Sequence, residues 1–148
     1  MQENSTGQMA LSDLRVLDLS RILAGPSATQ ILGDLGADVV KIETPTGGDD
    51  TRGWGPPFIK TSDGERAEAA YFACCNRNKR SVTLDFTQPT DLETLKKMVC
   101  AADILVENFK VGSLQKFGLD YESLSVLNPK LIYCSITGFG HSGPYANR

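Results

Sequence analysis

The residues whose types and spacing could do chemistry include a glycine-rich turn near residue 140. Gly138, Gly140 and Gly143 match the pattern G-x-G-x-x-G directly after a predicted strand. A dinucleotide site also needs a helix whose first amides face the pyrophosphate, and an acidic residue about 20 positions further on. Pro144 follows at once and the given sequence stops at Arg148, so a plain glycine turn is favoured over a nicotinamide-binding oxidoreductase.

The other nucleophilic and metal-ligating residue types give no recognisable catalytic arrangement. His141 is the only histidine, and no G-x-S-x-G segment accompanies it. The four cysteines form no C-x-x-C pair, which favours reduced, mostly buried thiols. We therefore predict no metal site and assign no catalytic residue in this sequence.

A run of cations precedes the third predicted strand. Residues 76–80 (NRNKR) hold three positive charges, and Arg52, Lys110 and Lys116 add to them. In an acidic chain, cations in loops around a sheet favour a phosphorylated small ligand, because guanidinium and ammonium groups pair with phosphate oxygens. A solvated strand edge is the alternative for the run taken alone.

Polar residues also follow two predicted strands. Glu107, Asn108 and Phe109 stand at the carboxyl end of the fourth strand, where open α/β sheets bind ligands, and Asn108 and Phe109 are the candidates for contact. They could contact a nucleotide by hydrogen bond and ring face, although a core role for Phe109 is equally compatible with the pattern. Glu43 ends the second strand, where we favour a surface carboxylate over a ribose-binding acid.

The scaffold that must position these residues is predicted from the alternation of short apolar runs with helical periods. The pattern predicts an α/β fold, a Rossmann-like parallel sheet with flanking helices. Strands are expected at 15–19, 38–43, 81–86, 103–106 and 130–136, and helices at 26–35, 66–76, 90–102, 111–117 and 121–127. Ile31, Leu32 and Leu35 share one face of the first helix, and residues 44–66 are expected to form an irregular surface loop.

Composition limits the classes of protein to which the chain can belong. The 148 residues suit one domain, with residues 1–10 as a flexible tail and 11–148 as the folded part. Fifteen basic and 18 acidic residues give a net charge of −3, which argues against a general nucleic-acid binder. No apolar run is long enough to span a membrane, and residues 1–10 show no signal or transit character.

Five segments, in order and in register, give the sequence a specific resemblance. They are LDLSRILAGPSATQILGDLGADVVKIE, DDTRGWGPPF, NRNKRSVTLDF, ADILVENFKVGSLQKFGLDYESL and NPKLIYCSITGFGHSGPYANR. From about residue 11 to 148 the chain resembles the amino-terminal part of a family III CoA-transferase, and most of all the branch that acts on dicarboxylates such as succinate and glutarate. The related α-methylacyl-CoA racemases rank second, because TRGWGPPF and the Asn of VENF are not expected of them.

The resemblance implies that this Rossmann-like part binds coenzyme A or acyl-CoA as a substrate, with no prosthetic group. By position, the implied contacts are Leu23, Ala24, Leu84, Asp85, Phe86, Thr87, Asn108, Phe109, Lys110 and Lys116. Lys116 stands where relatives often have Arg, and Thr44 stands where some have Arg. Lys116 keeps the charge without the bidentate fork, whereas Thr44 loses the charge.

The resemblance also implies a reaction and an assembly. An aspartate attacks the donor thioester, passes through an anhydride and an aspartyl-CoA thioester, and an acceptor carboxylic acid then takes the CoA. That aspartate is expected beyond the glycine-rich turn, so the isolated chain is expected to be an inactive fragment or a non-catalytic CoA-binding module. The complete protein is expected to form an interlocked homodimer, in the mitochondrial matrix or the cytoplasm.

Overall fold

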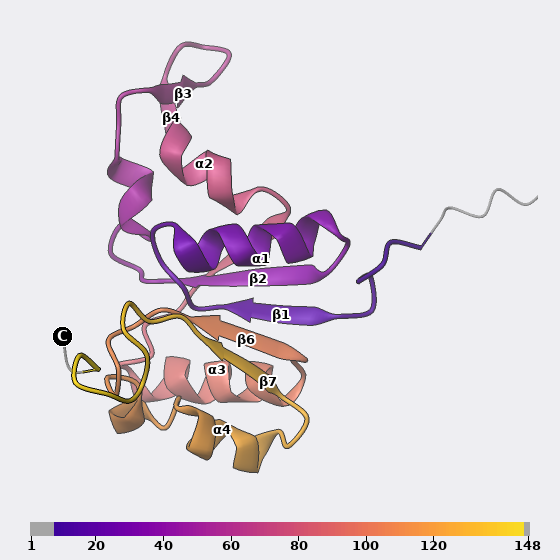
Figure 1. The fold of residues 1–148 in the computed structure, drawn as a ribbon. Helices are drawn as coiled ribbons and strands as arrows, with labels where there is room; N and C mark the ends of the chain where they lie inside the picture. The colour runs from indigo at the N-terminus through magenta and orange to yellow at the C-terminus, as the bar shows by residue number, and fades with distance from the viewer. Residues whose placement is uncertain (1–7, 147–148) are drawn as a thin grey trace, which may run out of the picture.

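The centre of the molecule is a five-stranded parallel sheet in the strand order β5-β2-β1-β6-β7 (Figure 1). The computed structural model describes residues 8–146, so seven residues of the predicted tail lie outside the described part. The strands of the sheet are β1 (Arg15–Asp18), β2 (Asp38–Glu43), β5 (Lys79–Thr83), β6 (Ile104–Glu107) and β7 (Ile132–Ser135). The predicted fold class, a Rossmann-like parallel sheet with flanking helices, is confirmed.

Helices cover both faces of the sheet. In Figure 1, α1 and α2 lie on one side and α3 and α4 on the other. The helices are α1 (Ala24–Asp34), α2 (Ala70–Asn76), α3 (Pro89–Cys100) and α4 (Tyr121–Leu127), with short 3₁₀ turns η1 (Asp50–Gly53) and η2 (Gln115–Phe117). Alternate residues of β1 therefore enter different cores, since Val16 packs on the α1 side and Leu17 on the α3 side.

The strand order reverses beside β1. From β1 the chain crosses to β2 and then to β5, and it later returns to β6 on the other side of β1. At the carboxyl ends of β1 and β6, the loops that leave these two strands consequently run to opposite faces of the sheet. Such a switch point is where open α/β sheets hold their ligands.

Several predicted boundaries differ from the structure. Residues 44–66 are not wholly irregular, because they contain η1 and the strand β3 (Phe58–Lys60), which pairs with β4 (Arg66–Ala69). The helix expected at 66–76 therefore starts only at Ala70. Within the stretch expected to be helical at 111–117, only η2 forms.

The buried face of α1 also differs from the prediction. Ile31 and Leu35 are exposed, whereas Gly25, Thr29 and Gly33 are buried against the sheet. A Cβ at residue 33 would lie only 3.0 Å from the carbonyl oxygen of Asn78. Small side chains therefore bring α1 close to the sheet. Of the three predicted apolar residues, Leu32 packs against the core as expected, and Ile31 and Leu35 remain outside.

No helix within residues 8–146 is long and apolar enough to cross a membrane. The described cysteines form no disulfide, and the expectation that most are buried is wrong. Cys75 is buried, and Cys74, Cys100 and Cys134 are exposed.

Candidate functional site

A cleft of about 170 Å³ opens at the carboxyl ends of the central strands. Its walls come from the segments that follow β1, β2, β5 and β6, as the switch point predicts. The apolar lining is Leu19, Ile42, Leu84, Phe86 and Phe109, and the polar lining is Arg21, Lys41, Glu43, Thr44, Asp49, Asp85 and Thr87, with Gly48. The cleft thus combines an apolar interior with charged groups, a combination typical of small-molecule and cofactor sites.

Five of the ten predicted contact residues line this cleft. They are Leu84, Asp85, Phe86, Thr87 and Phe109. The ring of Phe86 packs edge-on against Phe109, with 5.9 Å between ring centroids, and against Phe117 at 5.2 Å. Thr44, the position where the resemblance implied a lost charge, lines the cleft as well.

The other five predicted contact residues lie outside the cleft lining. Leu23 and Ala24 are exposed where α1 begins, after the β1–α1 loop. Lys110 lines a second hollow of about 570 Å³, together with Glu107, Tyr133 and His141. Lys116 lies in η2 over the ring of Phe117, and Asn108 binds protein backbone.

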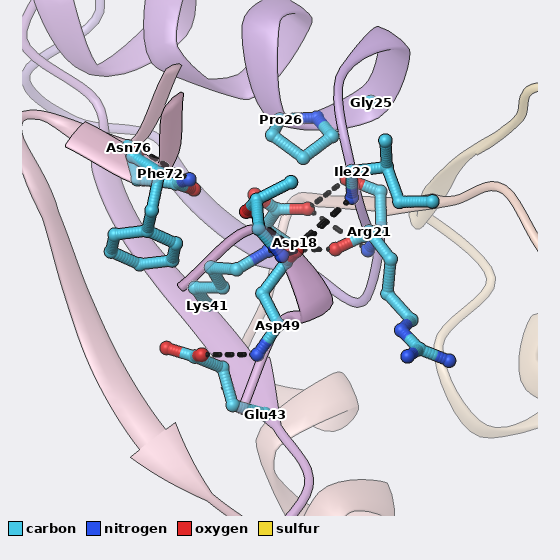
Figure 2. A network of polar contacts seen from close by, with 12 residues as sticks. Asp18, Arg21, Ile22, Gly25, Pro26, Lys41, Glu43, Asp49, Phe72 and Asn76 are labelled. Carbon is cyan, nitrogen blue, oxygen red and sulfur yellow. Dashed lines mark hydrogen bonds and ion pairs between the residues drawn. The ribbon is translucent and has the colours of Figure 1, made fainter. Parts of the chain in front are cut away.

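The β1–α1 loop is held from two sides. The side-chain oxygen of Asn108 accepts a hydrogen bond from the backbone N–H of Arg21 at 2.8 Å, and its NH₂ donates to the Arg21 carbonyl at 2.8 Å. The Asp49 carboxylate accepts the next N–H, that of Ile22, at 3.2 Å (Figure 2). Ile22 has a φ of 71°, a left-handed conformation that is costly for a β-branched residue.

Asp49 is itself part of a buried ion pair. The Lys41 ammonium lies 2.9 Å from the Asp49 carboxylate and donates to the Ser20 carbonyl at 2.8 Å. Thr51 donates to the same carboxylate through both its N–H and its hydroxyl. Burial alone would raise the pKa of Asp49, but the bonds from Lys41 and Thr51 lower it, so the group is a carboxylate at neutral pH.

A second buried pair lies beneath the start of α1. The Lys79 ammonium contacts the Asp18 carboxylate at 2.9 Å and donates to the Pro26 carbonyl at 2.8 Å. Thr29 and Ser20 also donate to Asp18. Burial lowers the pKa of Lys79, and the attraction of Asp18 opposes that shift. This pair joins β1, β5 and α1 below the loop.

Glu43 is buried and not a surface carboxylate as expected. Arg52 holds both of its oxygens, with Nε and Nη2 at 2.7 and 2.6 Å, and Nη1 of Arg52 also contacts Glu68 at 2.7 Å. Burial would raise the pKa of Glu43, but the hydrogen bonds from Arg52, Ser81 and the N–H of Asp49 outweigh it and lower the pKa to about 2. Glu43 is thus a structural anion that orders the segment after β2.

The cations of residues 76–80 do not gather at the cleft. Arg77 pairs with Asp34, Lys79 with Asp18, and Arg80 with Asp38. Arg52 is likewise held by two carboxylates, and none of these four residues lines the cleft, so a phosphate-binding role for them stays a prediction.

Lys41 and Asp49 were missed as structural components of the site. A lysine at the fourth position of the strand DVVKIE was the available signal, since a buried lysine needs an anion and Asp49 follows within ten residues.

The comparisons with known proteins agree with this geometry. The model of CoA-transferase family III matches residues 11–148. The chain is 58% identical over 137 residues to a succinate–glutarate CoA-transferase of Agrobacterium fabrum, covering 93% of this chain and 34% of that protein. It is 46% identical over 138 residues to the succinyl-CoA:glutarate CoA-transferase of Homo sapiens, covering 93% of this chain and 30% of that protein.

A solved structure is equally similar. A CAIB/BAIF family protein from Brucella suis matches with a TM-score of 0.90 and 59% identity, over 96% of this chain and 37% of that protein. The chain thus spans about a third of the length of these relatives. With the family model matching nearly all of its residues, the chain belongs to CoA-transferase family III.

Proposed function

We propose that this chain provides the CoA-binding part of an enzyme that moves CoA from succinyl-CoA to a dicarboxylate such as glutarate. The observation that carries the proposal is the cleft at the switch point, with five of the residues expected to bind CoA in its wall. The names of the relatives support the choice of donor and acceptor.

The chemistry of the cleft suits the nucleotide end of CoA. Phe86 and Phe109 offer apolar ring surface to an adenine ring. Arg21 is half-exposed at the same cleft, and one of its guanidinium nitrogens contacts Asp50 at 2.6 Å. A guanidinium in this position suits the phosphates of CoA, because it offers several N–H donors in one plane.

The carboxylates of the cleft are engaged in structural bonds. Glu43 is held by Arg52 and Asp49 by Lys41, each with bonds to both carboxylate oxygens, whereas Asp85 accepts the N–H and the hydroxyl of Thr87 at a single oxygen, Oδ1. A nucleophilic carboxylate must have an oxygen free to attack the thioester. Glu43 and Asp49 do not meet this condition, and the resemblance implies a nucleophile beyond the glycine-rich turn, so we propose that the catalytic aspartate comes from another part of the complete protein.

The proposed reaction conserves the energy of the thioester. The aspartate oxygen attacks the succinyl-CoA carbonyl and expels the CoA thiolate, which leaves a succinyl-aspartyl anhydride. The thiolate then attacks the aspartyl carbonyl, which releases succinate and forms aspartyl-CoA. Glutarate attacks that thioester in turn, and the thiolate finally attacks the glutaryl carbonyl of the new anhydride, giving glutaryl-CoA and the free aspartate.

The exposed apolar side chains fit the assembly that the resemblance implies. Ile31, Leu35, Val126 and Ile132 are each at least 45% exposed. We propose that the remainder of the complete protein and a second copy cover these faces in an interlocked homodimer. Light scattering of the complete protein would give a dimer mass if so, and a monomer mass would contradict this assembly.

Isothermal titration of the protein with CoA tests the binding proposal. Thr44→Trp places a large ring at the exposed edge of the cleft and should weaken CoA binding at least tenfold. Thr46→Trp is the matched control, since Thr46 is exposed and outside the cleft lining, and it should bind as the wild type does. Binding of CoA with equal affinity by all three proteins would place the site elsewhere, and no binding to the wild type would reject the proposal.

A further inference from the structure

Asn108 was expected to contact CoA, but the structure gives its side chain a different task. Its carbonyl oxygen and its NH₂ group bind the N–H and the C=O of one residue, Arg21, each at 2.8 Å. This arrangement resembles the pairing of a neighbouring strand, and it uses the side-chain amide both as a hydrogen-bond donor and as an acceptor. Asn108 therefore extends the pairing of β6 with β1 beyond the last residue of β1.

The next residue of the loop is fixed from the opposite side. Asp49 accepts the Ile22 N–H, and Lys41 and Thr51 hold Asp49 in place. The sulfur of Cys75 also lies 3.5 Å from the Ile22 carbonyl. Bonds from the residue that follows β6, from the β2–η1 segment and from α2 thus converge on two consecutive residues.

These bonds hold Ile22 in a backbone conformation that a β-branched residue does not favour. Ile22 has a positive φ, and its side chain is 37% exposed, so packing of that side chain does not explain the conformation. Strained backbone persists only where its surroundings over-determine it, and it is concentrated at ligand sites. Leu23 and Ala24, the next two residues, are the ones implied to approach CoA.

We propose that Asn108 is a positioning residue, whose side chain holds the β1–α1 loop in its CoA-binding conformation. This inference rests on the proposed function for the identity of the ligand, CoA. The part that concerns the loop conformation can be tested on the free protein. Without the two bonds, the loop populates other conformations. The apparent affinity for CoA then falls in proportion to the fraction of molecules whose loop keeps the CoA-binding conformation.

A purely structural role is the competing explanation, and the chain offers a matched control. Asn128 is also half-buried, and its NH₂ donates to two backbone carbonyls, those of Val99 and Ala102, at 2.9 and 2.8 Å. Val99 lies in the last turn of α3 and Ala102 lies between α3 and β6, at the amino-terminal end of β6 and thus at the end of the sheet opposite the cleft. Loss of either asparagine should cost comparable stability, but only Asn108 should affect the loop.

Amide hydrogen exchange of the free protein tests the conformational part. Asn108→Ala should raise the exchange rates of the Arg21 and Ile22 amides at least tenfold, relative to the amides of β1. Asn128→Ala should leave those two rates within twofold of the wild type. Equal protection of the loop in both variants would overturn the inference, whether or not the protein binds CoA.

CoA titration of the same variants tests the consequence for binding. Asn108→Ala should weaken CoA binding about tenfold or more, with Asn128→Ala within twofold of the wild type. Asn108→Asp at neutral pH keeps an acceptor for the Arg21 N–H and loses the donor, so its affinity should be reduced too, even if Asn108→Ala folds poorly. A wild type that binds CoA, with undiminished binding in both Asn108 variants, would overturn the inference and leave the proposed function intact.

Discussion

Lys41 and Asp49 form an ion pair at 2.9 Å in which the side chains are only 2% and 0% exposed. The pair connects β2 to the segment that carries Thr51 and Arg52, and through the Ile22 N–H to the β1–α1 loop. Two charges this deeply buried are stable only together, because either one alone would be left unsolvated. The conformation of the cleft thus depends on a charge balance inside the protein.

Lys41→Met should therefore destabilise the protein strongly. Removing one partner of a buried pair leaves the other charge uncompensated, at a cost of about 3–5 kcal/mol in the free energy of unfolding. Urea unfolding followed by circular dichroism measures this change. Adding Asp49→Asn to Lys41→Met should recover part of the loss, because it removes the orphaned charge.

The surface pair of Lys97 and Glu93 is the control. Its atoms approach to 2.7 Å, but both side chains are more than two-thirds exposed. Such pairs contribute little to stability. Lys97→Met should leave the urea midpoint nearly unchanged. An equal loss of unfolding free energy in Lys41→Met and Lys97→Met would show that burial does not determine the contribution of these ion pairs to stability.

The acid stability of the protein should depend on Glu43. Its pKa is lowered from 4.5 to about 2, so its ion pair contributes stability above pH 4.5 and loses it as the pH falls toward 2. The shift corresponds to a contribution on the order of 3 kcal/mol at neutral pH. Glu43→Gln should lower stability most above pH 5, and its difference from wild type should shrink toward pH 2.

Urea unfolding at several pH values between 2 and 7 measures that difference. Glu65→Gln replaces an exposed carboxylate of the β3–β4 turn and should follow the wild-type profile. A gap between Glu43→Gln and wild type that stays constant down to pH 2 would show that the carboxylate charge is not the cause.

Lys79 and Arg80 are neighbours in sequence with opposite surroundings. The Lys79 side chain is 2% exposed against Asp18, whereas that of Arg80 is 69% exposed beside Asp38. Lys79→Met should cost on the order of 3 kcal/mol in unfolding free energy, because Asp18 then lacks its counter-charge. Arg80→Ala should change neither stability nor CoA affinity, and a large loss of CoA affinity there would support the phosphate-binding interpretation of the run.

The sequence predicted the parallel sheet, because short apolar runs separated by helices permit few other folds. Residues 38–43 form β2 as predicted. The ion pair of Lys79 was harder to predict, since its partner Asp18 lies 61 residues away on another strand. A local pattern cannot tell such a lysine from one that faces solvent.

The face of α1 was mispredicted for a related reason. Apolar periodicity selected Ile31, Leu32 and Leu35, of which only Leu32 packs against the core, because close approach to the sheet selects residues without bulk. The small residues Gly25, Thr29 and Gly33 recur every four positions and form that contact face. Their spacing was visible in the sequence and was the signal to use.

Gly25→Ala tests this close approach directly. An added Cβ would lie 2.1 Å from the Cβ of Ser20, whose hydroxyl donates to Asp18 and whose carbonyl accepts from Lys41. Because both residues are buried, the start of α1 must move, at a cost of about 1–3 kcal/mol or more. The shift would reach Arg21 and should also weaken CoA binding.

Thermal unfolding and CoA titration of Gly25→Ala measure these two effects together. Gly138→Ala is the control, because a Cβ there meets no atom within 4 Å and the residue lies in an exposed turn. The control should unfold and bind as the wild type does. Because α1 begins at Ala24, a shift at Gly25 should also move the β1–α1 loop. Unchanged stability and CoA affinity in Gly25→Ala would mean that the helix can move away from β1 without moving that loop. The close packing of Gly25 would then not position the site.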